Sequence, residues 1–395
     1  MTPSWGKEMQ IFWDPIRAMK LAIEMARGRQ LAGSNPAKAV CNRRLMTQMR
    51  TLVEPSAKVE VRSSLAEANT MKICRWTATA FLFLFAVALH AQPGPGTPEA
   101  LFAAARQAAG LDHAGTYRRI CGVPDNRYGA PSRPPGNRAV PDRDTWYARP
   151  YRVFDNLYFI GTRFHSAWAM TTSDGIIVID SVFEYAVEAE MIEGLRALGL
   201  DPNDVRYILI SHAHGDHDQG AAIFQRRFGT EIVMGNADWE STLARTEYPG
   251  GVPTRDIGVG SDGLKLTLGE TTIDVISTPG HTPGTLSYIF PVIENGRSLT
   301  VMYAGGTAFN FPPSAEAFAI YRDSMVRSAE LARAAGATVL MSNHTEFDRA
   351  YDRARIAQLR RLPGEPHPYE TDVDTVVRYF EMSRDCAEAE RLLRQ

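Results

Sequence analysis

Three histidines and one aspartate lie within six residues of this chain, between a strand pattern and a helix pattern. They are His212, His214, Asp216 and His217, in the segment SHAHGDHDQG at 211–220. The apolar run VRYILI before this segment is typical of a buried strand, and AAIF after it begins a helical pattern. Histidine is the commonest metal-binding side chain, and connecting loops often carry function. The segment therefore predicts a fold that presents a metal site at the end of a strand.

Two later histidines occupy the same kind of position. His281 lies in the turn STPGHTPGT after the run TIDVIS, and His344 comes just after the run TVLMS. Side chains at three strand ends can meet at one sheet edge. Neutral imidazoles bind Zn²⁺ at ~2.0–2.1 Å, carboxylates bind at a similar distance, and a catalytic ion keeps one position open for water. Because five imidazoles and one carboxylate can hold two ions, we expect two zinc ions as cofactors.

These motifs resemble those of the metallo-β-lactamase superfamily. The segments SHAHGDHDQG, TPGHTPGT and SNHTEFD carry the resemblance, which covers about residues 151–348. It implies an α/β fold (α+β in some schemes) in which four layers form an αβ/βα sandwich, with the metals at the sheet edge. By position, His212, His214 and His281 match the first metal site, and Asp216, His217 and His344 match the second. Asp216 is then also the catalytic residue that helps to orient the attacking hydroxide.

One departure from related hydrolases bears on the substrate. Glyoxalase II and many lactonases place a metal-bridging Asp in a Gly-Asp-Thr turn, whereas this chain has Gly306 in the segment YAGGTAFNF. Thr307 stands where other subclasses of class B β-lactamases carry a Cys ligand. The chain therefore most resembles the third subclass of class B, in which solvent alone bridges the metals.

The resemblance implies an exported dinuclear-zinc hydrolase whose bridging hydroxide attacks a carbonyl, and we expect β-lactam ring hydrolysis. A lactone, ester or thioester hydrolase of the same fold is the alternative, and a zinc-binding protein without catalysis is a third. We expect a small-molecule substrate and a monomer. Residues 92–395 contain 30 basic and 39 acidic side chains, which argues against a nucleic-acid partner.

Four residues are predicted to contact the substrate. Tyr303, Thr307 and Asn310 follow a strand whose end should face the metals. Trp168 lies with His165 in the segment RFHSAWA, a hairpin that can overhang the metals in the family. A structural hairpin with Trp168 in the core is the alternative.

Residues 71–91 are typical of a secretory signal peptide. A basic lead, MKICR, precedes an uncharged run from Trp76 to Ala91, which is shorter than the ~20 residues of a membrane helix. Because such a signal should begin a chain, we expect Met71 to be the true start and 1–70 to be a mis-called extension. The mature protein is then periplasmic or secreted, with no stable membrane insertion after cleavage.

The remaining chain divides into three predicted parts. Residues 92–150 form an N-terminal helix and a Pro-rich arm, 151–348 the metallo-β-lactamase domain, and 349–395 C-terminal helices packed on it. Cys121 and Cys386 are the cysteines that remain after signal removal. An exported protein can join such a pair in a disulfide, but two unpaired thiols also fit the sequence.

Overall fold

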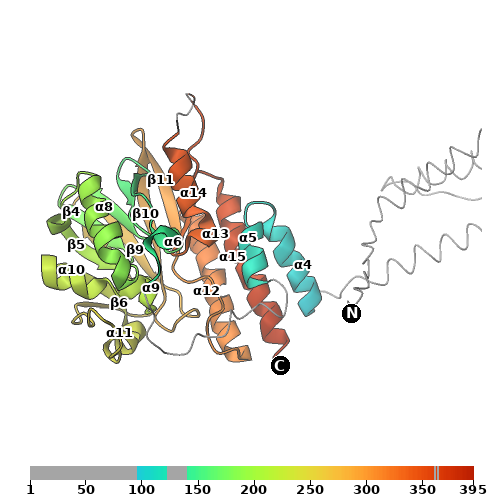
Figure 1. Ribbon diagram of the computed structural model, residues 1–395. Coiled ribbons are helices and arrows are strands. Elements are labelled where there is room, and N and C mark those ends of the chain that lie inside the picture. The colour runs from blue at the N-terminus through green and yellow to red at the C-terminus, as the bar shows by residue number, and fades with distance from the viewer. Residues whose placement is uncertain (1–95, 122–139, 360–361, 363) are drawn as a thin grey trace, which may run out of the picture. The chain divides into compact units, whose positions relative to one another are not determined.

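Two β-sheets form the centre of the described part of the chain, which comprises residues 96–121, 140–359, 362 and 364–395 of this computed structural model (Figure 1). In spatial order, the first sheet contains β1 (Tyr151–Arg152), β2 (Leu157–Phe159), β3 (Trp168–Thr172), β4 (Gly175–Ile179), β5 (Val205–Leu209), β6 (Glu231–Gly235) and β7 (Ile257–Val259). The second contains β12 (Val339–Ser342), β11 (Arg297–Ala304), β10 (Leu286–Glu294), β9 (Thr271–Ser277) and β8 (Leu264–Leu268). The predicted extension and signal peptide lie outside the described residues.

Strand direction determines where loops gather. Strands β4 to β7 are parallel, so their carboxyl ends share one edge of the first sheet. In the second sheet β11 and β12 are parallel, whereas β8, β9, β10 and β11 are joined as antiparallel pairs. Short turns at 173–174 and 269–270 connect the antiparallel neighbours β3 and β4, and β8 and β9.

Helices flank both sheets. Those that accompany the first sheet are α6 (Arg143–Trp146), α7 (Glu184–Ala186), α8 (Glu193–Ala197), α9 (Gly215–Asp218), α10 (Ala221–Phe228) and α11 (Asn236–Leu243). A π-helical turn, Val187–Ile192, joins α7 to α8, and a 3-10 turn, Pro202–Asp204, precedes β5. Those that accompany the second are α4 (Pro98–Ala109), α5 (Ala114–Ile120), α12 (Ala315–Ala334), α13 (Thr345–Asp348), α14 (Ala350–Ala357) and α15 (Val373–Leu392). None of the helices in the described ranges has both the length and the hydropathy of a membrane span.

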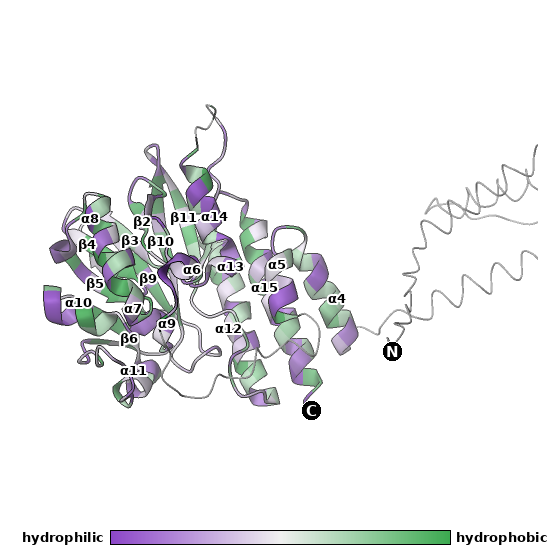
Figure 2. Cartoon of the chain, viewed as in Figure 1, coloured by the Kyte–Doolittle hydropathy of each residue, from purple (hydrophilic) through white to green (hydrophobic). Residues whose placement is uncertain are grey.

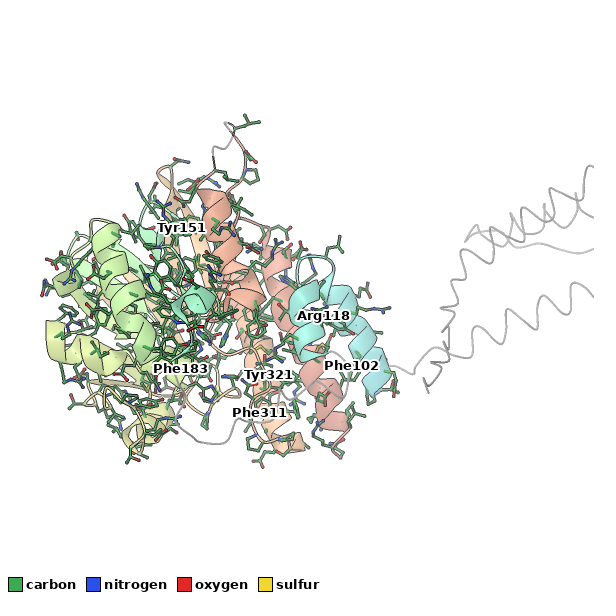
Figure 3. The ribbon with its side chains drawn as sticks, in the orientation of Figure 1. Phe102, Arg118, Tyr151, Phe183, Phe311 and Tyr321 are labelled. Carbon is green, nitrogen blue, oxygen red and sulfur yellow. A yellow bond between two sulfur atoms is a disulfide. The ribbon has the colours of Figure 1, made fainter. Side chains whose placement is uncertain are left out.

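Three apolar clusters hold these layers together. One lies between the sheets and joins residues such as Phe159 and Leu209 to Tyr288 and Val301. A second packs β4, β5 and β6 against α8, α10 and α11. The third packs β11 and β12 against α12, α15 and α4, and Phe102, Phe311 and Tyr321 in Figure 3 belong to it. Figure 2 shows apolar residues concentrated on the strands. The predicted αβ/βα sandwich is confirmed.

A disulfide connects the two segments that flank the sandwich in the sequence. It joins Cys121, just after α5, to Cys386 in α15, and both residues are buried in the third cluster. The sequence is compatible with a disulfide or with two unpaired thiols, and the structure has the disulfide. Because the bond closes a separation of 265 residues, chain entropy gives it a stabilising contribution of about 2–4 kcal/mol.

The buried carboxyl group of Glu190, in the π-helical turn, binds the backbone just before β1. Glu190 accepts a hydrogen bond from the backbone N–H of Ala148 at 2.7 Å, and its other oxygen has no hydrogen-bond partner among the described residues. Burial raises the pKa of Glu190 from 4.5 to about 8, although Arg143 and Arg163 lower it. Folding therefore favours the protonated form of this side chain.

This pKa gives stability a specific dependence on pH. The contribution of Glu190 is complete below its unfolded-state pKa and is lost as the pH rises through about 8. We expect the free energy of unfolding between pH 5 and 8 to decrease more in the wild type than in Glu190→Gln, by a few kcal/mol. Denaturant titrations across this range measure the difference, and parallel pH profiles for the two proteins would refute the assignment.

Candidate metal centre

Three imidazole rings converge at the carboxyl ends of β5 and β9. His212 Nε2 lies 2.9 Å from His214 Nδ1 and 3.1 Å from His281 Nε2, and the last two nitrogens are 3.2 Å apart. A tetrahedral ion with ligands at ~2.0–2.1 Å separates neighbouring nitrogens by ~3.3 Å. The three nitrogens, which we call the first cluster, therefore fit one face of a zinc tetrahedron.

Backbone carbonyls fix the tautomers of this cluster. His212 Nδ1 lies 3.0 Å from the carbonyl oxygen of Gly305, and His281 Nδ1 lies 2.6 Å from that of Ala308. A carbonyl can only accept, so each ring carries its hydrogen on Nδ1 and presents a lone pair at Nε2. Burial, followed by the neighbouring His214 ring, lowers the pKa of His281 to about 3 and keeps it neutral. Lone pairs that face one another in this way form a site that suits a cation.

A second cluster lies beside the first. His217 Nε2 is 3.1 Å from His344 Nε2 and 3.3 Å from Asp216 Oδ2, and the last two atoms are 3.2 Å apart. The rings of His212 and His217 have centroids only 4.4 Å apart, so the clusters adjoin. The structure thus brings all six predicted ligands together as two sets of three donors.

The second cluster attracts positive charge. Burial alone would lower the pKa of His217, but the carboxylates of Asp216 and Asp180 raise it to about 10. Burial would likewise raise the pKa of Asp216, yet His217 and His344 hold it well below its usual value. An ionised carboxylate among imidazoles is a donor set that suits a divalent metal ion.

Asp180 orients part of this site and was not predicted from the sequence. It follows β4 with a positive φ of 61°, and its carboxylate lies 3.1 Å from His217 Nδ1. It also accepts hydrogen bonds from the backbone N–H of Ser211 at 2.7 Å and the Tyr303 hydroxyl at 3.1 Å. Such carboxylates fix the orientation of metal-binding histidines. Its position at the end of the run GIIVID was the available signal.

His165 also reaches the second cluster, in the opposite tautomer. Its Nε2 lies 3.5 Å from Asp216 Oδ2, and its Nδ1 is 3.2 Å from Thr162 Oγ1. That hydroxyl accepts the backbone N–H groups of Phe164 and His165, so its own hydrogen points to Nδ1. The ring then carries its hydrogen on Nε2. His165 therefore presents an N–H to Asp216, whereas His212 and His281 present lone pairs to the first cluster.

The structure corrects three of the four predicted substrate contacts. Trp168 is completely buried between the sheets, where it packs against Phe159 and Tyr369. Tyr303 is also completely buried and is bonded to Asp180. Thr307 is buried, with its hydroxyl 2.6 Å from that of Tyr379. These side chains face the interior and cannot touch a substrate. Asn310 is exposed, and its contact stays a prediction.

Gly306 packs against a residue of the first cluster. A Cβ atom at this position would lie 2.5 Å from Cβ of His281 and 3.0 Å from Cγ2 of Thr285. Real Cβ atoms essentially never approach another atom to 2.5 Å, and 3.0 Å is already tight, so a methyl group at position 306 would require the His281 side chain to move. A carboxylate in the Gly-Asp-Thr arrangement could not be added without moving His281.

Comparison with known proteins agrees with this arrangement. The family described as "Metallo-beta-lactamase superfamily" matches residues 160–292, which include five of the six candidate ligands. This region, about a third of the chain, is similar to members of that superfamily. A subclass B3 metallo-beta-lactamase of Bradyrhizobium japonicum is 25% identical with a TM-score of 0.51, and the likeness covers 61% of this chain and 93% of that one. The Rm3 metallo-beta-lactamase is 26% identical, also with a TM-score of 0.51, over 62% and 95%.

Curated relatives include hydrolases of other substrates. A hydroxyacylglutathione hydrolase of Acidiphilium cryptum is 28% identical over 50% of this chain and 75% of its own length. An N-acyl homoserine lactonase of Bacillus thuringiensis is 29% identical over 31% of this chain. The chain spans about half the length (48%) of this lactonase. The matched region is therefore similar to hydrolases that act on different substrates.

Proposed function

We propose that the protein is an exported hydrolase that holds two zinc ions and opens the ring of a β-lactam. One observation carries this proposal: two adjoining sets of three donor atoms converge at mutual distances of 2.9–3.3 Å. Similarity to a subclass B3 enzyme supports the choice of substrate. The signal-peptide pattern at 71–91 supports export, which N-terminal sequencing of protein from the periplasm of a Gram-negative host would test.

Each candidate residue has a distinct task in this reaction. His212, His214 and His281 would hold one ion, and the second cluster would hold the other. When bound, such ions supply Lewis acidity and lower the pKa of water toward neutrality. Asp216 stays ionised, so it can accept a hydrogen bond from the attacking water and orient it toward the carbonyl. The N–H of His165 faces this carboxylate and helps to hold it.

Position 306 supports β-lactams over the alternative substrates. Hydrolases of the Gly-Asp-Thr type have a carboxylate between their metals, and the packing of Gly306 against His281 leaves no space for one. A lactone, ester or thioester hydrolase remains the second candidate, because a lactonase and a hydroxyacylglutathione hydrolase are among the relatives. A protein without catalysis is disfavoured by the complete set of converging donors.

A hydrolysis panel tests the proposal. The purified protein should hydrolyse penicillins, cephalosporins or carbapenems, lose this activity on chelation and regain it with zinc. The same samples should show much weaker cleavage of acyl homoserine lactones and of glutathione thioesters. Inertness to every β-lactam, together with cleavage of a lactone or thioester, would assign the second function. A protein that binds two zinc ions and hydrolyses nothing in the panel would support the third.

A further inference from the structure

One carboxylate outside both clusters contacts the two loops that carry the first cluster. Asp238 lies in the first turn of α11 and is completely buried. Its Oδ2 accepts hydrogen bonds from the backbone N–H of Ala213 at 2.8 Å and from the Thr282 hydroxyl at 2.7 Å. Its Oδ1 accepts one from the backbone N–H of Gly284 at 2.9 Å. Ala213 separates His212 from His214, and Thr282 follows His281.

The surroundings of this carboxylate leave no space for rearrangement. A Cβ atom on Gly284 would lie 2.6 Å from Cγ of Asp238, and one on Gly235 would lie 2.1 Å from the Gly284 carbonyl oxygen. The loop that carries His281 therefore packs directly against the start of α11. Arg245 donates a hydrogen bond to the carbonyl oxygen of Ala213 at 2.8 Å, so the Ala213 residue is held through both its N–H and its C=O.

We propose that Asp238 is the positioning residue of the first metal site. Its carboxylate binds both ligand loops, which are the loop with His212 and His214 and the loop with His281. The three ring nitrogens can therefore meet although the two loops are about 70 residues apart in the sequence. This inference rests on the proposed function, because it concerns how the chain presents its donors to zinc. It does not make Asp238 a ligand, since both its oxygens accept hydrogen bonds from the loops.

The ionised carboxylate is what the three donors require. Two N–H groups and one hydroxyl donate hydrogen bonds to its two oxygens. An ionised carboxylate can accept all three, because neither oxygen carries a hydrogen. An asparagine of the same shape offers one accepting oxygen, and its NH₂ group would face a donor. In Asp238→Asn at least one loop therefore loses its partner, and the buried N–H or O–H left behind favours a displaced loop.

The experiment compares Asp238→Asn with Glu190→Gln in the full chain. Glu190 is also completely buried and accepts a hydrogen bond from a backbone N–H, that of Ala148, which lies outside both ligand loops. Zinc titration should show a first-site affinity that falls about 10- to 100-fold in Asp238→Asn, with the second site nearly unchanged. Cadmium NMR should show a shifted or broadened signal for the three-nitrogen site alone. Glu190→Gln should match the wild type in both measurements.

Three results would overturn the inference. The first is an unchanged first site in Asp238→Asn, while the wild type binds two ions; this outcome leaves the proposed function intact. The second is equal weakening of both sites with a lowered melting temperature, which indicates general destabilisation. The third is a wild type that binds no zinc, which refutes the proposed function as well. If Asp238→Asn does not fold, Thr282→Val removes one of the three hydrogen bonds to Asp238, together with the contact of that hydroxyl with Thr285, and should weaken the first site in the same direction.

Discussion

His212→Ala should lose zinc from both clusters and lower kcat/KM for hydrolysis by about 10³-fold, roughly 4 kcal/mol of barrier. The ring of His212 supplies a donor nitrogen to the first cluster. The same ring adjoins the ring of His217 in the second cluster. Its removal leaves two imidazoles to hold the first ion, and it opens a gap beside the buried ring of His217. Metal analysis of the purified variant, with circular dichroism to confirm folding, measures the loss.

A second buried histidine provides the control for this experiment. His113 Nε2 lies 2.8 Å from the backbone carbonyl oxygen of Thr375, and the ring packs against Tyr379, so it belongs to neither cluster. His113→Ala should keep both zinc ions and most of the activity, even if its melting temperature falls. Full activity in His212→Ala, or equal zinc loss in the two variants, would contradict the proposed metal centre.

The sequence predicts for a physical reason that the six candidate ligands lie together. Each of the three groups directly follows an apolar strand pattern, and strand ends are positions that a sheet brings together. The strand patterns alone therefore place residues such as His281 and His344 at one sheet edge, without information about side-chain packing. The same logic predicts the layers, because strand and helix patterns alternate along the matched region.

Side-chain direction is what the sequence does not determine. Trp168 and Tyr303 lie at strand ends, as predicted, but their side chains are buried in the apolar cluster between the two sheets. Alternation along a strand decides which face a residue occupies, and a single register step reverses it. Asp180 and Asp238 were missed for a related reason. Each acts through contacts with backbone groups far away in the sequence. The position of Asp180 after a strand pattern was a signal, but it does not reveal which groups the carboxylate contacts.

A single methyl group at position 306 should impair the first metal site. From the sequence alone, Gly306 marks a missing bridging carboxylate, and an added aspartate would be expected to keep or tighten zinc binding. The structure predicts the opposite, since a Cβ atom there would lie 2.5 Å from Cβ and 2.9 Å from Cγ of His281. Either the imidazole or the end of β11 must move. In both cases Nε2 of His281 leaves the place where it meets His212 and His214.

We therefore expect Gly306→Ala and Gly306→Asp both to weaken the first site and to lower β-lactam turnover by about 100-fold, because a displacement of ~1 Å can have an effect of this size. Gly115→Ala is the matched control, since its Cβ would meet nothing within 4 Å in α5, and it should behave as the wild type. Zinc titration and turnover on a β-lactam and a lactone separate the explanations. If Gly306→Asp binds zinc more tightly and gains lactone turnover while Gly306→Ala loses both, the carboxylate does bridge the metals. The close packing of Gly306 would then not limit the site, and the argument for β-lactams over lactones would fail with it.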